Sequence, residues 1–146
     1  MIKFTIPIVP VAQMRARHTA RNGFAVAYKD KKQVAQEENL NTFLMHFVPT
    51  MPLDGQIMLG VRAYLPIPKS MPKNKREAAK KHILRPTTKP DLDNLLKHVK
   101  DCMTMMRFWG DDKQVVGYLP HTGKYYSENP RWEIEIVKIN PDLYND

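Results

Sequence analysis

The chain has little cysteine and no long apolar run, and both features limit what it can be. Cys102 is the single cysteine among 146 residues, so no disulfide can form within the chain and we expect an intracellular protein. No apolar segment approaches the length of a membrane span, and the N-terminal segment, interrupted by Pro7 and Pro10, is too short for a signal peptide. We therefore expect a cytoplasmic protein without a membrane partner.

Several ligand-binding patterns are also missing. The five histidines do not stand at metal-ligand spacing from one another or from Cys102, so no zinc site is predicted. There is no glycine-rich phosphate loop and no internal repeat.

Charge, in contrast, is abundant and unevenly distributed. The formal net charge is +8, from 23 Lys and Arg against 15 Asp and Glu. Residues 69–100 alone carry ten basic and three acidic side chains, a net charge of +7. A basic surface with carboxylates placed inside it is typical of a site that holds a divalent metal against a nucleic-acid backbone.

The carboxylates of this region flank one predicted amphipathic helix. Asp91 follows Pro90 and is well placed to cap a helix from Leu92 to about Met106. The apolar residues fall on an arc of roughly 120°, and they are Leu92, Leu95, Leu96, Val99, Cys102, Met103 and Met106. The opposite side carries Asp93, Lys97, Lys100 and Asp101. Two carboxylates at a helix start also have a purely structural explanation, since an Asp caps a helix and a first-turn negative charge gains about 0.3–1 kcal/mol from the helix dipole.

The segment K-P-D-L-D-N-L-L-K, followed by Asp101 and then by F-W-G-D-D-K-Q-V, resembles the signature of the RusA family of Holliday junction resolvases of bacteria, phages and prophages. The resemblance covers Lys89 to Val116. It implies a homodimeric, Mg²⁺-dependent endonuclease that cuts four-way DNA junctions in recombination and repair, with Mn²⁺ as a substitute metal. The essential aspartates of the family fall on Asp91, Asp93 and Asp112, and its helix lysine falls on Lys97. We assign these four residues as catalytic, and the metal ligands as Asp91, Asp93, Asp112 and Asp111.

Basic residues on both sides of this segment are assigned to DNA binding. Two lie in a loop that ends at the turn signal Asn22-Gly23, and the others lie in a partly helical segment from Lys69 to Lys81 and in the stretch that follows it. They are Arg15, Arg17, Lys69, Lys73, Lys75, Arg76, Lys80, Lys81, Arg85 and Lys89. The alternative is that these are solvated surface charges.

The predicted fold is α+β, a single RusA-like domain over residues 1–146 with a sheet of about four strands packed against two main helices. Alternation predicts the strands, which are Ile2 to Pro7, Gln56 to Ile67, Val115 to Pro120 and Trp132 to Ile139. The second helix is expected within Tyr28 to Val48. Trp109 is interpreted as a core residue, and Tyr125 and Tyr126 as part of a solvated hairpin.

Two questions stay open at this level. The function could instead be non-catalytic nucleic-acid binding, or cleavage of other branched DNA or of RNA. A helix from Leu92 to Met106 is roughly 20 Å long, so Asp112 starts far from Asp91 and Asp93. Either the chain folds back along the helix, or a two-fold partner presents its own Asp112.

Overall fold

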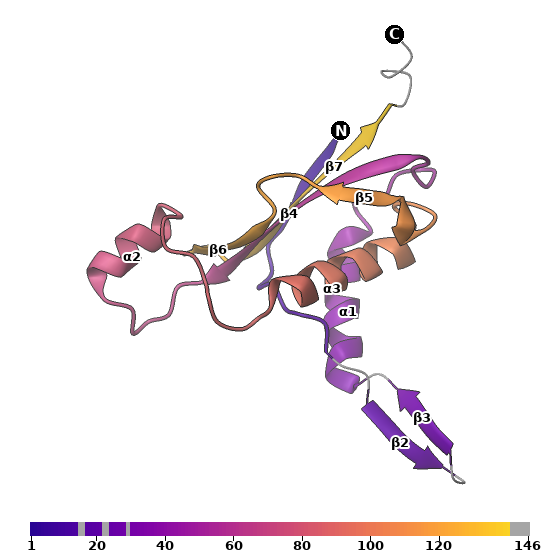
Figure 1. Cartoon of the computed structure of the whole chain (residues 1–146), viewed down its shortest axis with the longest axis horizontal. Helices are drawn as coiled ribbons and strands as arrows, with labels where there is room; N and C mark the ends of the chain where they lie inside the picture. Colours follow the sequence, from indigo (N-terminus) through magenta and orange to yellow (C-terminus); the bar gives the residue numbers. More distant parts are fainter. Residues whose placement is uncertain (15–16, 22–23, 29, 141–146) are drawn as a thin grey trace.

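The computed structural model describes residues 1–14, 17–21, 24–28 and 30–140. Figure 1 shows the order of its elements along the chain. They are β1 (Ile2–Ile6), β2 (Arg17–Arg21), β3 (Phe24–Tyr28), α1 (Lys31–Leu44), β4 (Gln56–Pro66), α2 (Lys73–Lys80), α3 (Leu92–Met105), the 3₁₀ turn η1 (Asp112–Gln114), β5 (Val115–Tyr118), β6 (Gly123–Ser127) and β7 (Arg131–Ile139).

The main sheet is built around β4, its longest strand. The strand order is β1-β7-β4-β5, and β6 also pairs with β4. Strand β5 runs parallel to Ile57–Leu59 and β6 runs parallel to Arg62–Pro66, so two short strands share one edge of β4. Between them, Thr122 supplies a side-chain acceptor, Oγ1, for the backbone N–H of Val61 at 3.2 Å.

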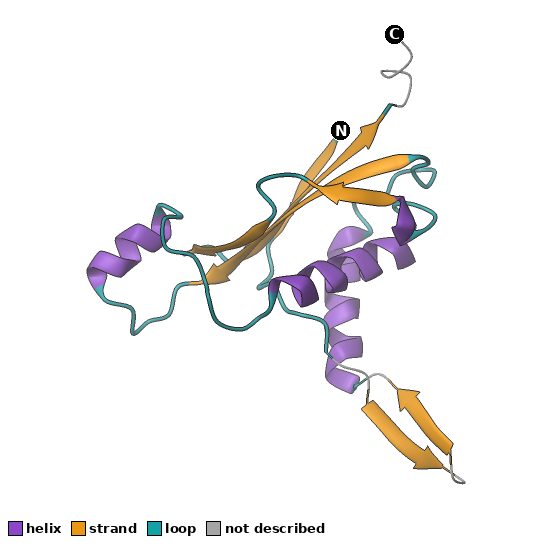
Figure 2. Ribbon diagram, in the orientation of Figure 1, coloured by secondary structure: helices purple, strands orange, loops and turns teal. Residues whose placement is uncertain are grey.

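Helices α1 and α3 cover one face of this sheet (Figure 2). Alternate residues of β4, namely Ile57, Leu59 and Val61, are fully buried in the same core as Leu95 and Val99 of α3. Each such side chain contributes about 1.5–3 kcal/mol by leaving water. Because the apolar arc of α3 is buried in this core, the opposite side of the helix faces outward.

The α+β class is confirmed, as are the helix at Leu92, the helical part of the Lys69–Lys81 segment and the burial of Trp109 and Cys102. The main sheet has five strands where about four were expected, because Tyr125 and Tyr126, interpreted as part of a solvated hairpin, belong to strand β6. Local turn signals at Pro120 and Gly123 obscured a strand whose partner lies some 60 residues earlier in the chain.

The N-terminal expectations also need correction. Tyr28 belongs to β3, and α1 begins only at Lys31, because Asp30 Oδ1 accepts a hydrogen bond from the N–H of Lys32 at 2.8 Å and caps the helix. The expected basic loop contains strand β2, which pairs with β3 as a separate two-stranded sheet. The predicted turn at residues 22–23 and the predicted contact residue Arg15 lie outside the described residues.

The two predicted basic regions lie far apart in space. Figure 1 shows α2 at one end of the molecule and the β2–β3 hairpin at the other, with the start of α3 between them. Among the described residues, no helix is both long and apolar enough to cross a bilayer.

Candidate active site

The start of α3 presents two of the predicted aspartates. Asp91 has an extended backbone and caps the helix, with its Oδ1 accepting a hydrogen bond from the N–H of Asp93 at 2.8 Å. Both aspartates are exposed. They line one hollow of about 390 Å³ together with Thr87, Thr88, Lys89, Leu92 and Lys124. Among the residues that the structure describes, no hydrogen bond or ion pair engages the Asp93 carboxylate, which leaves it available to a ligand.

A neighbouring hollow joins Asp93 to Asp112. It has a volume of about 340 Å³ and is lined by Asp93, Leu96, Lys97, Lys100, Asp101, Asp112 and Tyr118. Asp112 also lines a third hollow with Thr104 and Met105 near the end of α3, and Tyr118 stands beside Lys97 and Lys100 nearer its start. The chain after α3 therefore folds back along the helix, which brings Asp112 into the same hollow as Asp93 within one subunit.

Asp111 and Asp112 form the turn that starts this return. Asp111 caps η1, with its Oδ1 accepting from the N–H of Lys113 at 2.9 Å, and Gln114 Oε1 accepts in turn from the N–H of Asp111 at 3.0 Å. The hydrogen bond that Asp111 accepts from the Lys113 backbone lowers the pKa of Asp111. Asp111 is thus held as a carboxylate by its capping role, while Asp112 lines the hollow shared with Asp93 and the third hollow near the end of α3.

The carboxylates of these hollows suit a hard divalent cation only in part. Mg²⁺ takes oxygen ligands, keeps several waters and is often held by one or two carboxylates. Asp91 and Asp93, in one hollow, meet that requirement. Three or more His, Cys, Asp or Glu side chains do not converge as a metal-binding group anywhere in the described part of the chain. Asp112 lines the adjoining hollow and not the one lined by Asp91.

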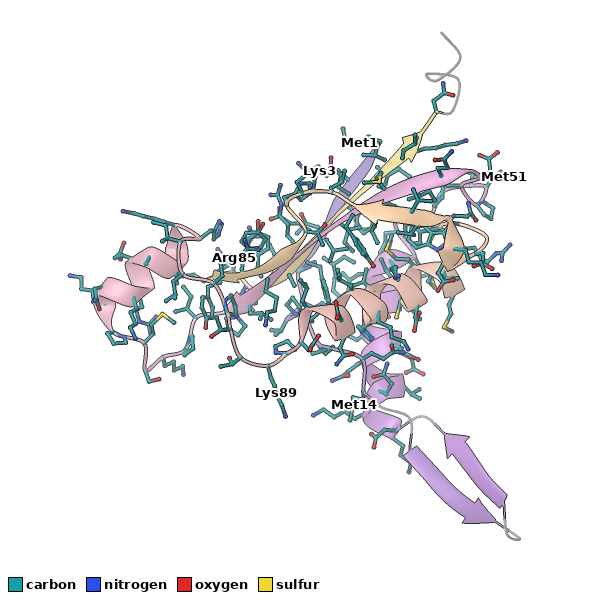
Figure 3. The ribbon with its side chains drawn as sticks, in the orientation of Figure 1. Met1, Lys3, Met14, Met51, Arg85 and Lys89 are labelled. Atoms are coloured by element: carbon teal, nitrogen blue, oxygen red, sulfur yellow. The ribbon has the colours of Figure 1, made fainter. Side chains whose placement is uncertain are left out.

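Most of the predicted DNA-binding residues fall into two groups: lysines that are exposed, and side chains that already have partners within the protein. Exposed lysines lie on α2, beside it and in the loop before α3, and Figure 3 shows Lys89 projecting from that loop. These are Lys69, Lys73, Lys75, Lys81 and Lys89. Arg17 lies in β2, where only its backbone is described.

Three of the predicted contacts are engaged inside the molecule. Arg76 donates to the carbonyl oxygens of Met71, Pro68 and Lys69, at 3.0, 2.8 and 2.7 Å, and so closes the loop before α2. Lys80 forms an ion pair with Glu128 at 2.8 Å. The Arg85 guanidinium carbon lies 4.1 Å from the ring centroid of Tyr125. These side chains have structural partners that compete with a phosphate.

A buried polar cluster lies beneath α3. Gln33 and His98 are almost fully buried, and Gln33 Nε2 donates to Glu37 Oε1 at 3.0 Å and lies 3.5 Å from His98 Nδ1. Burial lowers the pKa of His98, although the negative charges of Glu37 and Asp101 oppose that effect. His98 is therefore held as the neutral imidazole.

Some residues of the hollows were not predicted. Lys124 lines the Asp91 hollow from β6, and Tyr118 lines the Asp112 hollow from β5, with the Lys100 Nζ 5.7 Å from its ring centroid. Lys124 is distant in the sequence from Asp91, whose hollow it lines, and Tyr118 is distant from Asp93, although it follows Asp112 closely. Their positions follow from the pairing of β5 and β6 with β4, and no local sequence signal indicates that pairing.

Together, the fold and these hollows define an α+β protein with a basic surface around exposed carboxylates. Residues 7–137 match the model of the family described as Endodeoxyribonuclease RusA. The chain belongs to this family.

Two relatives bear on the match. The chain is 38% identical over 141 residues to the Bacillus subtilis (strain 168) protein described as "Uncharacterized protein YqaN", covering 95% of this chain and 97% of that protein. It is 43% identical over 53 residues to the crossover junction endodeoxyribonuclease RusA of Lactococcus phage r1t, which covers 36% of this chain and 39% of the phage protein.

Proposed function

We propose that this protein is a divalent-metal-dependent endodeoxyribonuclease that resolves four-way DNA junctions in recombination and repair. The observation that supports it most is the position of Asp93, whose unengaged carboxylate lines one hollow with Asp91 and the next with Asp112. Membership of the endodeoxyribonuclease family supports the same reaction. Acting in the cytoplasm is consistent with the lone, buried thiol of Cys102.

Each group around the hollows has a proposed role. Asp91 and Asp93 would hold Mg²⁺ or Mn²⁺, with Asp112 contributing from the adjoining hollow and Asp111 capping the turn that carries Asp112. A metal bound there would supply a nucleophilic water and would neutralise charge at the phosphate. Lys97, which lines the hollow between Asp93 and Asp112, binds the phosphate and stabilises the negative charge that develops on it.

The exposed lysines account for DNA affinity. Lys89 lines the Asp91 hollow and would contact the phosphate next to the scissile one. The lysines of the α2 segment would bind a neighbouring arm, because α2 lies beyond the start of α3 at one end of the molecule (Figure 1). A four-way junction has two-fold symmetry, so a homodimer would place one active site on each of two strands.

The test is incubation of the purified protein with end-labelled four-way junction, linear duplex or single strand of matched sequence, in Mg²⁺ or in EDTA. We expect cuts near the branch point of the junction in Mg²⁺, and no product in EDTA. Cutting of duplex as fast as junction would contradict the substrate assignment. Tight binding of the junction with no cutting in Mg²⁺ or Mn²⁺ would instead favour non-catalytic binding, in which Asp91 and Asp111 act only as helix caps.

A further inference from the structure

Lys124 belongs to β6, but its side chain reaches the loop that leads into α3. Its Nζ donates to the carbonyl oxygens of Thr88 and Pro90, each at 2.9 Å. These two carbonyls stand on either side of Lys89, and Pro90 is the residue directly before Asp91. The ammonium group of Lys124 thus ties the backbone next to Asp91 to the sheet.

The rest of β6 supports the same loop. Arg85 Nε donates to the carbonyl oxygen of Lys124 at 2.8 Å, and its guanidinium stacks on Tyr125. The ring of Tyr125 in turn stacks on that of Tyr64, with 5.3 Å between centroids. Because Tyr64 belongs to β4, the loop before α3 is anchored through β6 to the central strand of the main sheet.

We propose that Lys124 is a positioning residue of the active site. By holding the Thr88 and Pro90 carbonyls it fixes the backbone that presents Asp91, and so sets where that carboxylate lies in the hollow shared with Asp93. A lysine suits this task, because its ammonium carries three donors on a flexible stem and can satisfy two carbonyls at once. The proposal rests on the proposed function of this hollow as a metal site.

The charge of Lys124 and its positioning role have opposite effects on metal binding. An ammonium that lines the hollow repels a cation, so losing its charge alone would strengthen metal binding. Losing a partner that orients a ligand weakens metal binding, typically by about 10–100-fold. Whether metal affinity falls or rises when Lys124 is replaced therefore distinguishes a positioning role from a purely electrostatic effect.

The experiment uses Lys124→Met, which keeps most of the stem and removes the donors, and Lys124→Arg, which keeps charge and donors. Lys138→Met is the matched control, since Lys138 is an exposed lysine that pairs with Asp54 near the opposite end of β4. Two quantities are measured on the full chain without DNA: Mn²⁺ affinity by calorimetry, and the hydrogen-exchange rate of the Asp93 amide by NMR. That amide reports on Asp91 directly, because it donates to Asp91 Oδ1.

We expect Lys124→Met to bind Mn²⁺ about tenfold more weakly, with the Asp93 amide exchanging about tenfold faster. Lys124→Arg should stay within about twofold of the wild type in metal affinity, and Lys138→Met should match the wild type in both measurements. Unchanged or tighter Mn²⁺ binding in Lys124→Met, with unchanged exchange at Asp93, would overturn the proposal.

Two further outcomes are also decisive. Should Lys124→Met fail to fold, Lys124→Leu, which also lacks donors, is judged by the same criteria. A wild-type protein that binds no Mn²⁺ and cuts no junction would refute the proposed function. The positioning role of Lys124 would then be accepted or rejected on the hydrogen-exchange rate of the Asp93 amide alone.

Discussion

Replacing Asp91 separates two roles of one carboxylate, because Asp91 both caps α3 and lines the hollow proposed to hold the metal. Its cap consists of one hydrogen bond, 2.8 Å from Oδ1 to the N–H of Asp93. Asn and Ser cap helices about as well as Asp, whereas Ala loses about 1 kcal/mol. In a chain of this length that loss lowers the melting temperature by about 2–4 °C.

We therefore expect Asp91→Asn and Asp91→Ser to melt within a degree or so of the wild type and Asp91→Ala to melt about 2–4 °C lower. Junction cleavage in Mg²⁺ should fall in all three variants by at least about tenfold, since losing a metal ligand costs no less than losing a residue that orients one. Thermal unfolding and cleavage of a labelled junction are measured on the same preparations.

Asp30 provides the matched control. It caps α1 in the same way, through a 2.8 Å hydrogen bond from the N–H of Lys32, and it does not line the Asp91 hollow. Asp30→Ala should lose comparable stability and keep its cleavage rate. If Asp91→Asn and Asp91→Ser cut junctions at the wild-type rate, Asp91 is a cap and nothing more, and its assignment as a ligand fails.

Three further outcomes are expected. Mixing Asp93→Asn with Asp112→Asn chains under subunit exchange should restore no nicking, because both residues line one hollow of a single chain; recovered nicking would show a site shared between subunits. Burial lowers the pKa of His98, so the unfolded chain binds a proton that the folded chain excludes, and the free energy of unfolding should fall as pH drops below about 6.5. His98→Gln should flatten that dependence in pH-dependent denaturation, and the exposed control His46→Gln should leave it intact. Three exposed lysines of the α2 segment can be changed together to Gln, namely Lys73, Lys75 and Lys81. The slope of log DNA affinity against log salt concentration should become shallower by roughly 0.9 per lost contact. An unchanged slope would exclude phosphate contacts there.

The parts of the fold that the sequence predicted are those with a local, periodic signal. The apolar arc of α3 follows from residues three and four apart, and the alternation of β4 from every second residue. Strand β6 has no such signal, because Pro120 and Gly123 suggest a turn and its partner in β4 is distant in sequence. Lys124 was missed for the same reason, since its role depends on where β6 lies.

The charged residues show a second limit. Arg76 and Lys75 are neighbours in a basic run, and the sequence assigns both to DNA. Only the tertiary structure shows that Arg76 bonds three carbonyls of the preceding loop while Lys75 stays exposed. Similarly, His98 lies within the α3 pattern, but its polar environment comes from Gln33 and Glu37 of α1.

The measurement that tests the central claim most directly compares wild type with Asp93→Asn on one labelled four-way junction, with binding and cleavage followed in parallel. The carboxylate of Asp93 faces both hollows, so its loss should abolish cutting in Mg²⁺. Junction binding should be equal or tighter, because one negative charge near the phosphates is removed. Cutting by Asp93→Asn at the wild-type rate, or loss of binding together with loss of folding, would contradict the catalytic assignment.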